Sequence, residues 1–456
     1  MRKAKNIFIF VFILILIVPL ITLNTKRNYA SDVDNRYLTE FPDELNFELL
    51  NNLEDYLQDR HGFRDQMIFM DQKADFLLFG KYPNYKLGKQ GYLFGYDIAQ
   101  EEYTPYHESF VDMVEKIYIY CKDRNIPFLF VINPYRIDVY PEYSPLGFNY
   151  KEKWIKVFLG ELEKRNIPYI YTKSALLDAK NEGIPVFNKK YDVNHWNDNG
   201  AFVGTTSILK ELSRQIPIYI NGISDFELTS ITNKYVINTK FSIDETTIKY
   251  EPLTMTEKIS EQYESMFKDK QYRSFSYYKN PTRKNEGYPK CLVFQGSYLN
   301  TRGAKFFANS FSEYISVHDY KNVMNFDYYF NLFKPDCVVF EVANHAFADG
   351  YFPKTEMDEI NFNPVFEKFK SYPVSKKNIK DLSVFSEDNG NIRSYTFNGL
   401  KNIKYGYFEI DGKIYDMINN EYTDGKYMGF VDNTLVSKRT PDKIYLMKDG
   451  NVVLYE

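Results

Sequence analysis

The chain has 456 residues, of which 44% are hydrophobic and 26% charged, which is ordinary for a globular protein with room for two or three domains. Its net charge of −4, without a stretch that concentrates Lys and Arg, argues against a nucleic-acid-binding surface. The three cysteines, Cys121, Cys291 and Cys337, stand in apolar segments and predict buried free thiols rather than a disulfide framework.

The N-terminal segment carries a targeting signal. Arg2, Lys3 and Lys5 precede an uncharged apolar run over residues 7–23. This pattern predicts a single-pass membrane anchor over residues 1–24, with the N-terminus inside and the bulk of the chain outside. A cleaved signal peptide, which would leave a secreted protein, is the alternative, although small residues do not frame a convincing cleavage site.

Residues 25–90 predict a linker followed by helices. Leu and Phe recur at near-helical spacing over residues 45–57, and a second helix is expected over 65–79. The segment 88–94, with glycines at its first and fourth positions, predicts a turn that leads into a short strand.

Residues 91–374 alternate between helices and short apolar strands. Helices are expected over 110–123, 151–165, 173–181, 201–214 and 302–311, and strands over 128–132, 169–171, 185–187, 291–294, 315–317 and 337–340. The phrase Asn-Ile-Pro, at Asn125 and Asn166, twice connects a helix to a strand. This alternation predicts an α/β domain in which helices flank a parallel sheet.

Two segments depart from this pattern. Residues 217–290 are rich in Thr, Ile and Tyr and then charged, and they predict an insertion with β-hairpin character. In residues 375–456, Asp-Gly pairs at Asp411, Asp424 and Asp449 stand between aromatic and β-branched runs. Such pairs are typical of hairpin turns, so a small all-β module is expected at the C-terminus.

The loop before the helix over 201–214 contains Asp192-Val193-Asn194-His195-Trp196. An Asp three residues before a His lets the carboxylate orient one imidazole nitrogen while the other nitrogen faces a nucleophile. The spacing alone is weak, and a capping loop with a hydrogen-bonded His is the alternative. Asn197 or Asn199 is expected to cap the helix that follows.

The candidate nucleophile is Ser297, in Gln295-Gly296-Ser297-Tyr298, directly after the strand over 291–294. Asn344 follows the strand over 337–340. Parallel strands present their carboxyl ends at one sheet edge, where the Ser297 N–H and the Asn344 amide could stabilise an oxyanion. The alternative is that both residues cap local structure.

Further residues are weaker candidates. A sugar groove is a possible environment for five side chains, each of which could equally be structural: Trp196, Tyr298, Arg302, Tyr135 and Arg136. The other histidines are scattered in sequence without metal-ligand spacing, so neither a metal nor a cofactor is predicted.

Over residues 36–347 the chain resembles the SGNH hydrolase superfamily, and within it the alginate O-acetyltransferase-like branch of cell-surface polysaccharide acetyltransferases, the DHHW-motif proteins. Beside the Asp192–Trp196 and Gly296–Tyr298 motifs, the resemblance is carried by segments 36–42, 57–65, 88–94, 132–136 and 139–141. The Asp and His precede the Ser here, which implies the circularly permuted SGNH-like order of this branch.

The resemblance implies that Ser297 is the nucleophile, His195 the general base, Asp192 its orienting carboxylate and Asn344 an oxyanion donor. Two motifs differ: the branch usually has Gly-Asp-Ser-Phe around the Ser, and its Asp and His are often one residue apart. No counterpart of the superfamily's oxyanion Gly is evident.

The implied activity is O-acetylation of an extracytoplasmic polysaccharide, with a membrane-bound O-acyltransferase as the partner that supplies the acetyl group. The alternatives are a carbohydrate acetyl esterase of the same fold, and a non-catalytic glycan-binding or scaffold protein.

Overall fold

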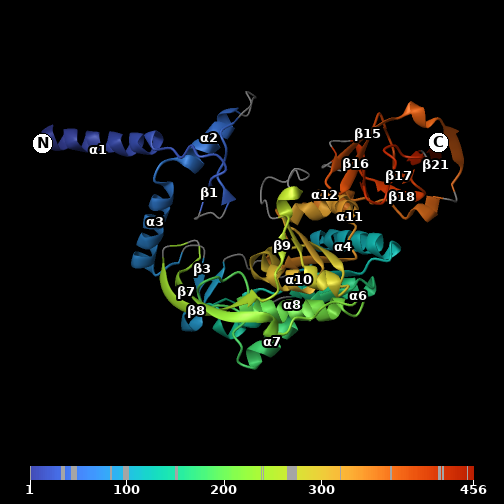
Figure 1. Cartoon of the computed structure of the whole chain (residues 1–456). Helices are drawn as coiled ribbons and strands as arrows, with labels where there is room; N and C mark the ends of the chain where they lie inside the picture. The colour runs from blue at the N-terminus through green and yellow to red at the C-terminus, as the bar shows by residue number, and fades with distance from the viewer. Residues whose placement is uncertain are drawn as a thin grey trace.

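The structure is a computed structural model of the chain, and it describes residues 2–31, 36–42, 49–82, 85–95, 102–148, 153–237, 239, 241–263, 275–318, 320–369, 372–419, 423, 426–448 and 450–456. These residues form a mixed α/β fold. A central sheet lies between helices, and a β-rich module at the C-terminal end packs beside α4 and α11 (Figure 1). The broad prediction of an α/β protein is therefore confirmed.

Within the described residues the central sheet has seven strands in the order β6-β5-β13-β11-β12-β10-β9. The parallel strands are β5 (Phe128–Asn133), β6 (Tyr169–Tyr171), β11 (Lys290–Phe294), β12 (Glu313–Val317) and β13 (Cys337–Ala343). Two antiparallel strands, β10 (Phe275–Lys279) and β9 (Glu257–Lys258), extend the β12 edge. Phe294, Phe340 and Phe130 stand side by side across β11, β13 and β5, so these strands end at one common edge.

Helices cover both faces of the sheet. One face packs against α4 (Pro105–Asp123), α6 (Lys153–Lys164) and α11 (Phe326–Phe333); the other packs against α7 (Lys173–Asn181), α8 (Asp198–Leu212) and α10 (Ala304–Ser310). In β5, Phe128, Phe130 and Ile132 enter the first core, whereas Leu129 and Val131 enter the second. This two-residue alternation explains why the whole strand is apolar. All three cysteines are free and buried, as predicted.

The repeated Asn-Ile-Pro phrase works as a helix stop. Asn125 and Asn166 have positive φ angles of 57° and 54°. Asn tolerates the left-handed conformation that ends a helix, and the following Pro cannot continue one. Both helix-to-strand connections predicted from this phrase are confirmed.

Some predicted elements differ from the structure. Residues 185–187 are irregular rather than a strand, because the Val186 N–H donates to the Tyr140 hydroxyl at 3.2 Å and the Val186 carbonyl accepts from Asn197 N at 3.0 Å. The helix expected over 302–311 is a π-helical turn, η6 (Leu299–Gly303), continued by α10. Helix α4 begins earlier than expected, after Thr104, whose N–H donates to His107 Nδ1 at 3.0 Å.

The segment 217–290 contains the expected hairpin and also contributes to the central sheet. Strands β7 (Phe226–Tyr235) and β8 (Ser242–Pro252) form a long antiparallel pair beside α8 (Figure 1). Tyr250 N donates to Asp198 Oδ2 at 3.1 Å, which joins β8 to the first turn of α8. Strands β9 and β10 of the same segment lie in the central sheet.

The N-terminal part contains α1 (Arg2–Ile21), the short strands β1 (Ala30–Ser31) and β2 (Arg36–Tyr37), and helices α2 (Leu49–Arg60) and α3 (Arg64–Phe79). Residues 45–48 of the helix expected over 45–57 lie outside the described residues. The predicted turn is present between β3 (Tyr85–Leu87) and β4 (Leu93–Gly95), through η1 (Lys89–Gly91). Across the described ranges, no helix is both long and apolar enough to cross a membrane, so the structure does not support the predicted anchor.

The last part of the chain is built from strands. One sheet has the order β14-β21-β20-β17-β18 and another β15-β16-β19. Their bounds are β14 (Val374–Lys377), β15 (Ser383–Asn389), β16 (Ile392–Asn398), β17 (Tyr405–Ile410), β18 (Lys413–Met417), β19 (Tyr427–Asp432), β20 (Lys443–Lys448) and β21 (Asn451–Tyr455). Asp411 and Gly412, with φ of 47° and 75°, form the turn between β17 and β18, as predicted. Asp424 and Asp449 lie outside the described residues.

A buried polar contact joins these strands to the α/β part. The Tyr120 hydroxyl donates to Asp416 Oδ2 at 2.6 Å, and Arg124 donates to the same oxygen at 2.8 Å. The rings of Tyr328 on α11 and Phe430 on β19 lie 5.1 Å apart, edge to face. Aromatic packing and a shared carboxylate therefore fasten the β-rich module to the helices.

Candidate active site

Asp192 and His195 lie in the loop before α8. The imidazole Nδ1 is 3.0 Å from Asp192 Oδ1 and 3.2 Å from Oδ2, so the carboxylate can hold the ring in one orientation. The loop is fixed where it enters the helix, because Asn197 Oδ1 accepts the Gly200 N–H at 2.9 Å. Asn197 is therefore the cap, which decides between the two residues expected for that role.

Ser297 lies in the turn between β11 and η6, at the carboxyl edge of the sheet. The preceding Gly296 donates its N–H to Glu341 Oε2 at 2.6 Å. A Cβ at position 296 would stand 3.1 Å from the same oxygen, so a glycine permits this close approach. The Ser297 hydroxyl is buried and makes no hydrogen bond within the described residues.

Two direct contacts join the His195 loop to the Ser297 turn. Trp196 Nε1 donates to the Tyr298 carbonyl at 3.0 Å, and Arg302 donates to Asp192 Oδ2 at 2.7 Å. The His195 and Tyr298 rings lie 5.5 Å apart. Residues that flank the predicted base and the predicted nucleophile therefore touch one another, although about a hundred positions separate them in sequence.

The charge of Asp192 is strongly favoured. Burial alone would raise its pKa, but attraction and hydrogen bonds from His195 and Arg302 outweigh this effect and hold the pKa well below its usual range. An ionised Asp192 stabilises an imidazolium on His195, which is what a general base requires after it accepts a proton.

Glu341 is a site residue that the sequence reasoning missed. It is 1% exposed, and its second oxygen, Oε1, accepts the Asn133 Nδ2–H at 2.6 Å. Burial raises its pKa to about 7, while the hydrogen bonds from Asn133 and Gly296 oppose this rise. The available signal was a single carboxylate inside the otherwise apolar segment of β13.

Two histidines and a tyrosine also lie around the turn. His318 Nδ1 is 2.7 Å from the Gln295 carbonyl. Burial lowers the pKa of His345 to about 3, and the nearby His195 and His318 lower it further. Burial also raises the pKa of Tyr320, and the neighbouring Ser297 partly opposes this effect. The two histidines had looked scattered because they are far from His195 in the sequence.

Asn344 lies at the same sheet edge, after β13. Its Nδ2 donates to the buried Asp138 carboxylate at 3.2 Å and lies 3.4 Å from the Tyr171 hydroxyl. These contacts direct its amide toward the loop that follows β5. To serve as an oxyanion donor, the side chain would have to leave Asp138.

The residues expected in a sugar groove fall into two groups. Trp196, Tyr298 and Arg136 are 0%, 1% and 3% exposed, which favours the structural alternative for these three residues. Trp196 and Tyr298 connect the two active-site segments, and Arg136 donates to the backbone carbonyls of residues 93, 188 and 189. Tyr135 and Arg302 are half-buried. In the part of the chain that the structure describes, no three His, Cys, Asp or Glu side chains are grouped to hold a metal ion.

No protein-family model matches the chain, and no curated protein matches it. Among solved structures it is similar to PatB1 of Bacillus cereus, at 17% identity over 57% of this chain and 95% of that chain, with a TM-score of 0.44. It is also similar to the O-acetyltransferase domain of Pseudomonas putida AlgJ, at 16% identity over 61% of this chain and 99% of that domain, with a TM-score of 0.42. A DHHW family protein from Eubacterium siraeum is 17% identical over 60% of this chain and 98% of that chain, with a TM-score of 0.41. The kind of protein that the sequence motifs resemble is thus also found among the structural neighbours.

Proposed function

We propose that the protein is an O-acetyltransferase that acetylates an extracytoplasmic polysaccharide through an ester on Ser297, within a circularly permuted SGNH-like domain. The observation that supports this function best is the pair of contacts between the two active-site segments, Trp196 to Tyr298 and Arg302 to Asp192. They join the loop that carries the carboxylate-oriented His195 imidazole to the turn that carries the buried Ser297 hydroxyl.

In the first half-reaction, His195 Nε2 takes the Ser297 proton while Ser297 Oγ attacks the acetyl carbonyl of the donor. The donor oxygen leaves and takes the proton back from His195, so the acetyl group becomes an ester of Ser297. The missing Ser297 hydrogen bond must form in this step, and catalytic hydrogen bonds often tighten only when substrate is bound.

In the second half-reaction, a sugar hydroxyl gives its proton to His195 and attacks the Ser297 ester. The acetyl group moves to the sugar oxygen, and Ser297 Oγ recovers its proton from the imidazolium. The Ser297 N–H is the proposed oxyanion donor, joined by Asn344 if its amide turns away from Asp138. The proposed source of the acetyl group is a membrane-bound O-acyltransferase.

The first test is an incubation of the protein with an activated aryl acetate, with and without an oligosaccharide. We expect an acetylated sugar in the presence of the oligosaccharide, and a mass increase of one acetyl group on the peptide that contains Ser297. Free acetate alone would identify an acetyl esterase. Neither product would identify a non-catalytic surface protein.

The matched variants for this test are Ser297→Ala and Thr301→Ala. Thr301 lies one turn after the proposed nucleophile, is exposed, and donates to the Ser297 carbonyl at 2.7 Å. Ser297→Ala should abolish both the peptide adduct and turnover, whereas Thr301→Ala should retain the adduct. Turnover that survives in folded Ser297→Ala protein would refute the serine ester.

A further inference from the structure

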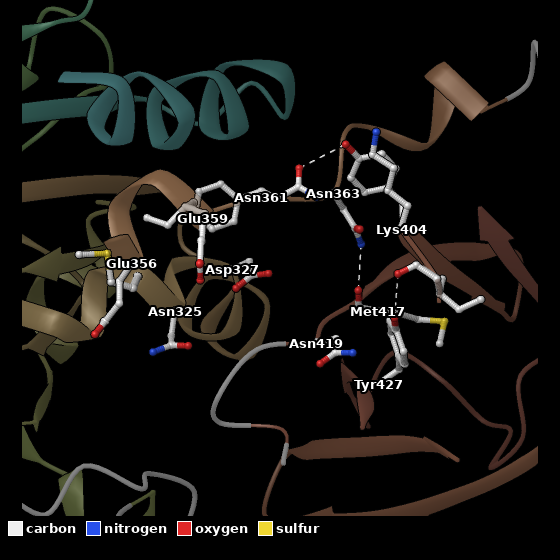
Figure 2. A pocket seen from close by; sticks show the side chains of 15 residues that line it. Asn325, Asp327, Glu356, Glu359, Asn361, Asn363, Lys404, Met417, Asn419 and Tyr427 are labelled. Carbon is white, nitrogen blue, oxygen red and sulfur yellow. Dashed lines mark hydrogen bonds between the residues drawn. The ribbon is translucent and has the colours of Figure 1, made fainter. Parts of the chain in front are cut away.

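A pocket of about 510 Å³ lies where the α/β part meets the β-rich module. Its first wall comes from η7 (Tyr320–Asn325), the start of α11, and α12 (Lys354–Glu359) with the residues that follow it. Its second wall comes from β17, β18, β19 and their connections. Figure 2 shows Asn325, Asp327 and Glu356 on one side, facing Met417, Asn419 and Tyr427 on the other. A cavity of this size between two parts of a chain is typical of ligand sites.

Hydrogen bonds between the walls hold the pocket open. Asn363 Nδ2 donates to the Gly406 and Met417 carbonyls, both at 2.9 Å. The Tyr405 hydroxyl lies 3.3 Å from Asn361 Oδ1, also across the pocket, while the Tyr427 hydroxyl braces the second wall by donating to the Ile403 carbonyl at 2.8 Å (Figure 2). The walls are therefore fixed before any ligand binds, which reduces the entropy cost of binding.

The lining combines amides with aromatic rings. Asn325, Asn361, Asn363 and Asn419 supply side-chain amides, which can both donate and accept hydrogen bonds. Phe362, Tyr405 and Tyr427 add apolar ring surface, and both phenols add a hydroxyl. Sugar rings present hydroxyl groups at their edges and C–H bonds on their faces, so this mixture suits an oligosaccharide.

The charges of the pocket select among oligosaccharides. Its carboxylates are Asp327, Glu356 and Glu359, and its one cation among the described lining residues is Lys404. Lys321 Nζ lies 3.8 Å from Glu356 Oε1. The exposed Glu359 has no ion pair within the described residues. The excess of negative charge favours a protonated amine and disfavours a uronate.

The pocket is connected to the proposed active site by one short helix. η7 begins at Tyr320, whose phenol lies beside Ser297, and ends at Asn325 in the pocket. Its 6 residues span about 10 Å, given the rise of roughly 2 Å per residue in a 3-10 helix. The pocket and the proposed nucleophile are therefore separated by the length of one short helix.

We infer that this pocket binds the acceptor, and that the acceptor is an oligosaccharide with free amino groups. The pocket itself is argued from its lining alone, while its role in acetyl transfer rests on the proposed function. The bound amine pairs with the carboxylates, the amides bind neighbouring hydroxyl groups, and the polymer extends along η7 to Ser297.

The test is calorimetric titration of the Ser297→Ala protein, which separates binding from turnover. The probes are a β-linked glucosamine oligomer, its fully N-acetylated form and a uronate oligomer of equal length. We expect the glucosamine oligomer to bind most tightly, the uronate most weakly, and added salt to weaken only the amine-dependent part. Glu359→Gln should weaken glucosamine binding about fivefold, as the loss of one exposed ion pair implies.

Glu182→Gln is the matched control, because Glu182 is an exposed carboxylate directly after α7, away from the pocket. It should leave the affinity unchanged. Equal loss in both variants, tighter binding of the uronate, or no saturable binding of any probe would overturn the inference. Glucosamine binding by a protein that transfers no acetyl group would retain the pocket and refute only the proposed function.

Discussion

The carboxylate of Glu341 supports the turn that carries Ser297. One of its oxygens accepts from the Gly296 N–H and the other from Asn133 Nδ2, both at 2.6 Å. Because each oxygen has a donor, the ionised form fits this position, yet burial raises the pKa to about 7. Hydrogen bonding and burial therefore have opposite effects on the pKa of Glu341, which contacts the residue before the proposed nucleophile.

This conflict predicts a pH dependence of stability. The folded pKa of Glu341 is about 7 and the ordinary value is 4.5, so between these values the folded state holds more proton than the unfolded state. The contribution of this residue to the free energy of unfolding therefore falls as the pH rises from about 4.5 to 7. Urea unfolding across this range should show the decline in the wild type and a smaller decline in Glu341→Gln. An identical decline in both proteins would contradict the assignment.

For Arg302 the sequence left a sugar contact and a structural role open, and its bond to Asp192 favours a positioning role. Arg302→Met should lower kcat by about tenfold or more, because a hydrogen bond between charged groups contributes roughly 1.5–3 kcal/mol. KM for the oligosaccharide should stay within about twofold, since the missing interaction is not with substrate. Steady-state kinetics with an aryl acetate donor measure both quantities. A rise in KM at constant kcat would return Arg302 to the sugar site.

At the residue scale, the sequence allowed prediction of those candidate site residues that belong to a local motif. Asp192, His195 and Ser297 were chosen from local motifs, and their neighbours are in contact in the structure. Glu341, His318 and Tyr320 have no local motif, and only the pairing of β11 with β12 and β13 brings them to the turn. For Trp196 and Tyr298 the sequence left a sugar contact and a structural role open, because a large aromatic residue beside a motif is as often a packing residue as a ligand contact.

At the scale of one element, α8 positions the His195 loop through an unusually close contact. A Cβ at Gly204 would lie 2.2 Å from Cζ3 of Trp196, the residue that bonds the Tyr298 carbonyl. Glycine is therefore required where this helix passes the indole. Glycine usually destabilises a helix because of the conformational entropy that it loses on folding, but here it allows the helix to pass close to the indole.

Gly204→Ala should therefore destabilise the protein by about 1–3 kcal/mol through overpacking, and it should reduce activity by displacing Trp196. Gly160 in α6 provides the control, because a Cβ there meets no atom within 4 Å. Gly160→Ala should raise stability by about 0.5–1 kcal/mol through better helix propensity. Thermal unfolding of both variants measures the difference. Equal effects would show that Gly204 is not constrained by the indole.

The elements that were predicted correctly are those with local stop or turn signals. Asn125 and Asn166 end helices, and Asp411-Gly412 forms a hairpin, because these residues tolerate positive φ wherever the chain places them. Val186 was misassigned because its apolar neighbours reflect burial, while its backbone bonds go to Tyr140 and Asn197 instead of a strand. β10 entered the central sheet through pairing with β12, which no local pattern marks.

At the scale of the whole molecule, Asp416 is one of the polar links between the two parts that border the pocket. Asp416→Ala would leave the Tyr120 hydroxyl and the Arg124 guanidinium without this partner in a mostly buried position. We expect a loss of about 3 kcal/mol and separate unfolding of the β-rich module in a calorimetric scan.

Lys376→Ala is the control for this prediction, because it removes an ion pair with Glu456 that is exposed on both sides. Its effect should stay within about 0.5 kcal/mol. A single unchanged transition in Asp416→Ala would mean that the remaining contacts, such as the Asn363 hydrogen bonds and the packing of Tyr328 against Phe430, are enough to fasten the module.

The order of strands in the central sheet has a consequence for synthesis on the ribosome. β5 is made early, but the strand that separates it from β11 in the sheet is β13, which follows more than two hundred residues later. β11 pairs with the same late strand. Until β13 emerges, the nascent chain has an open edge where the middle of the sheet belongs, and such distant pairings form slowly. The turn that carries the proposed nucleophile therefore reaches its final surroundings only after β13 has been made, so a chain that stops before β13 should lack the proposed activity.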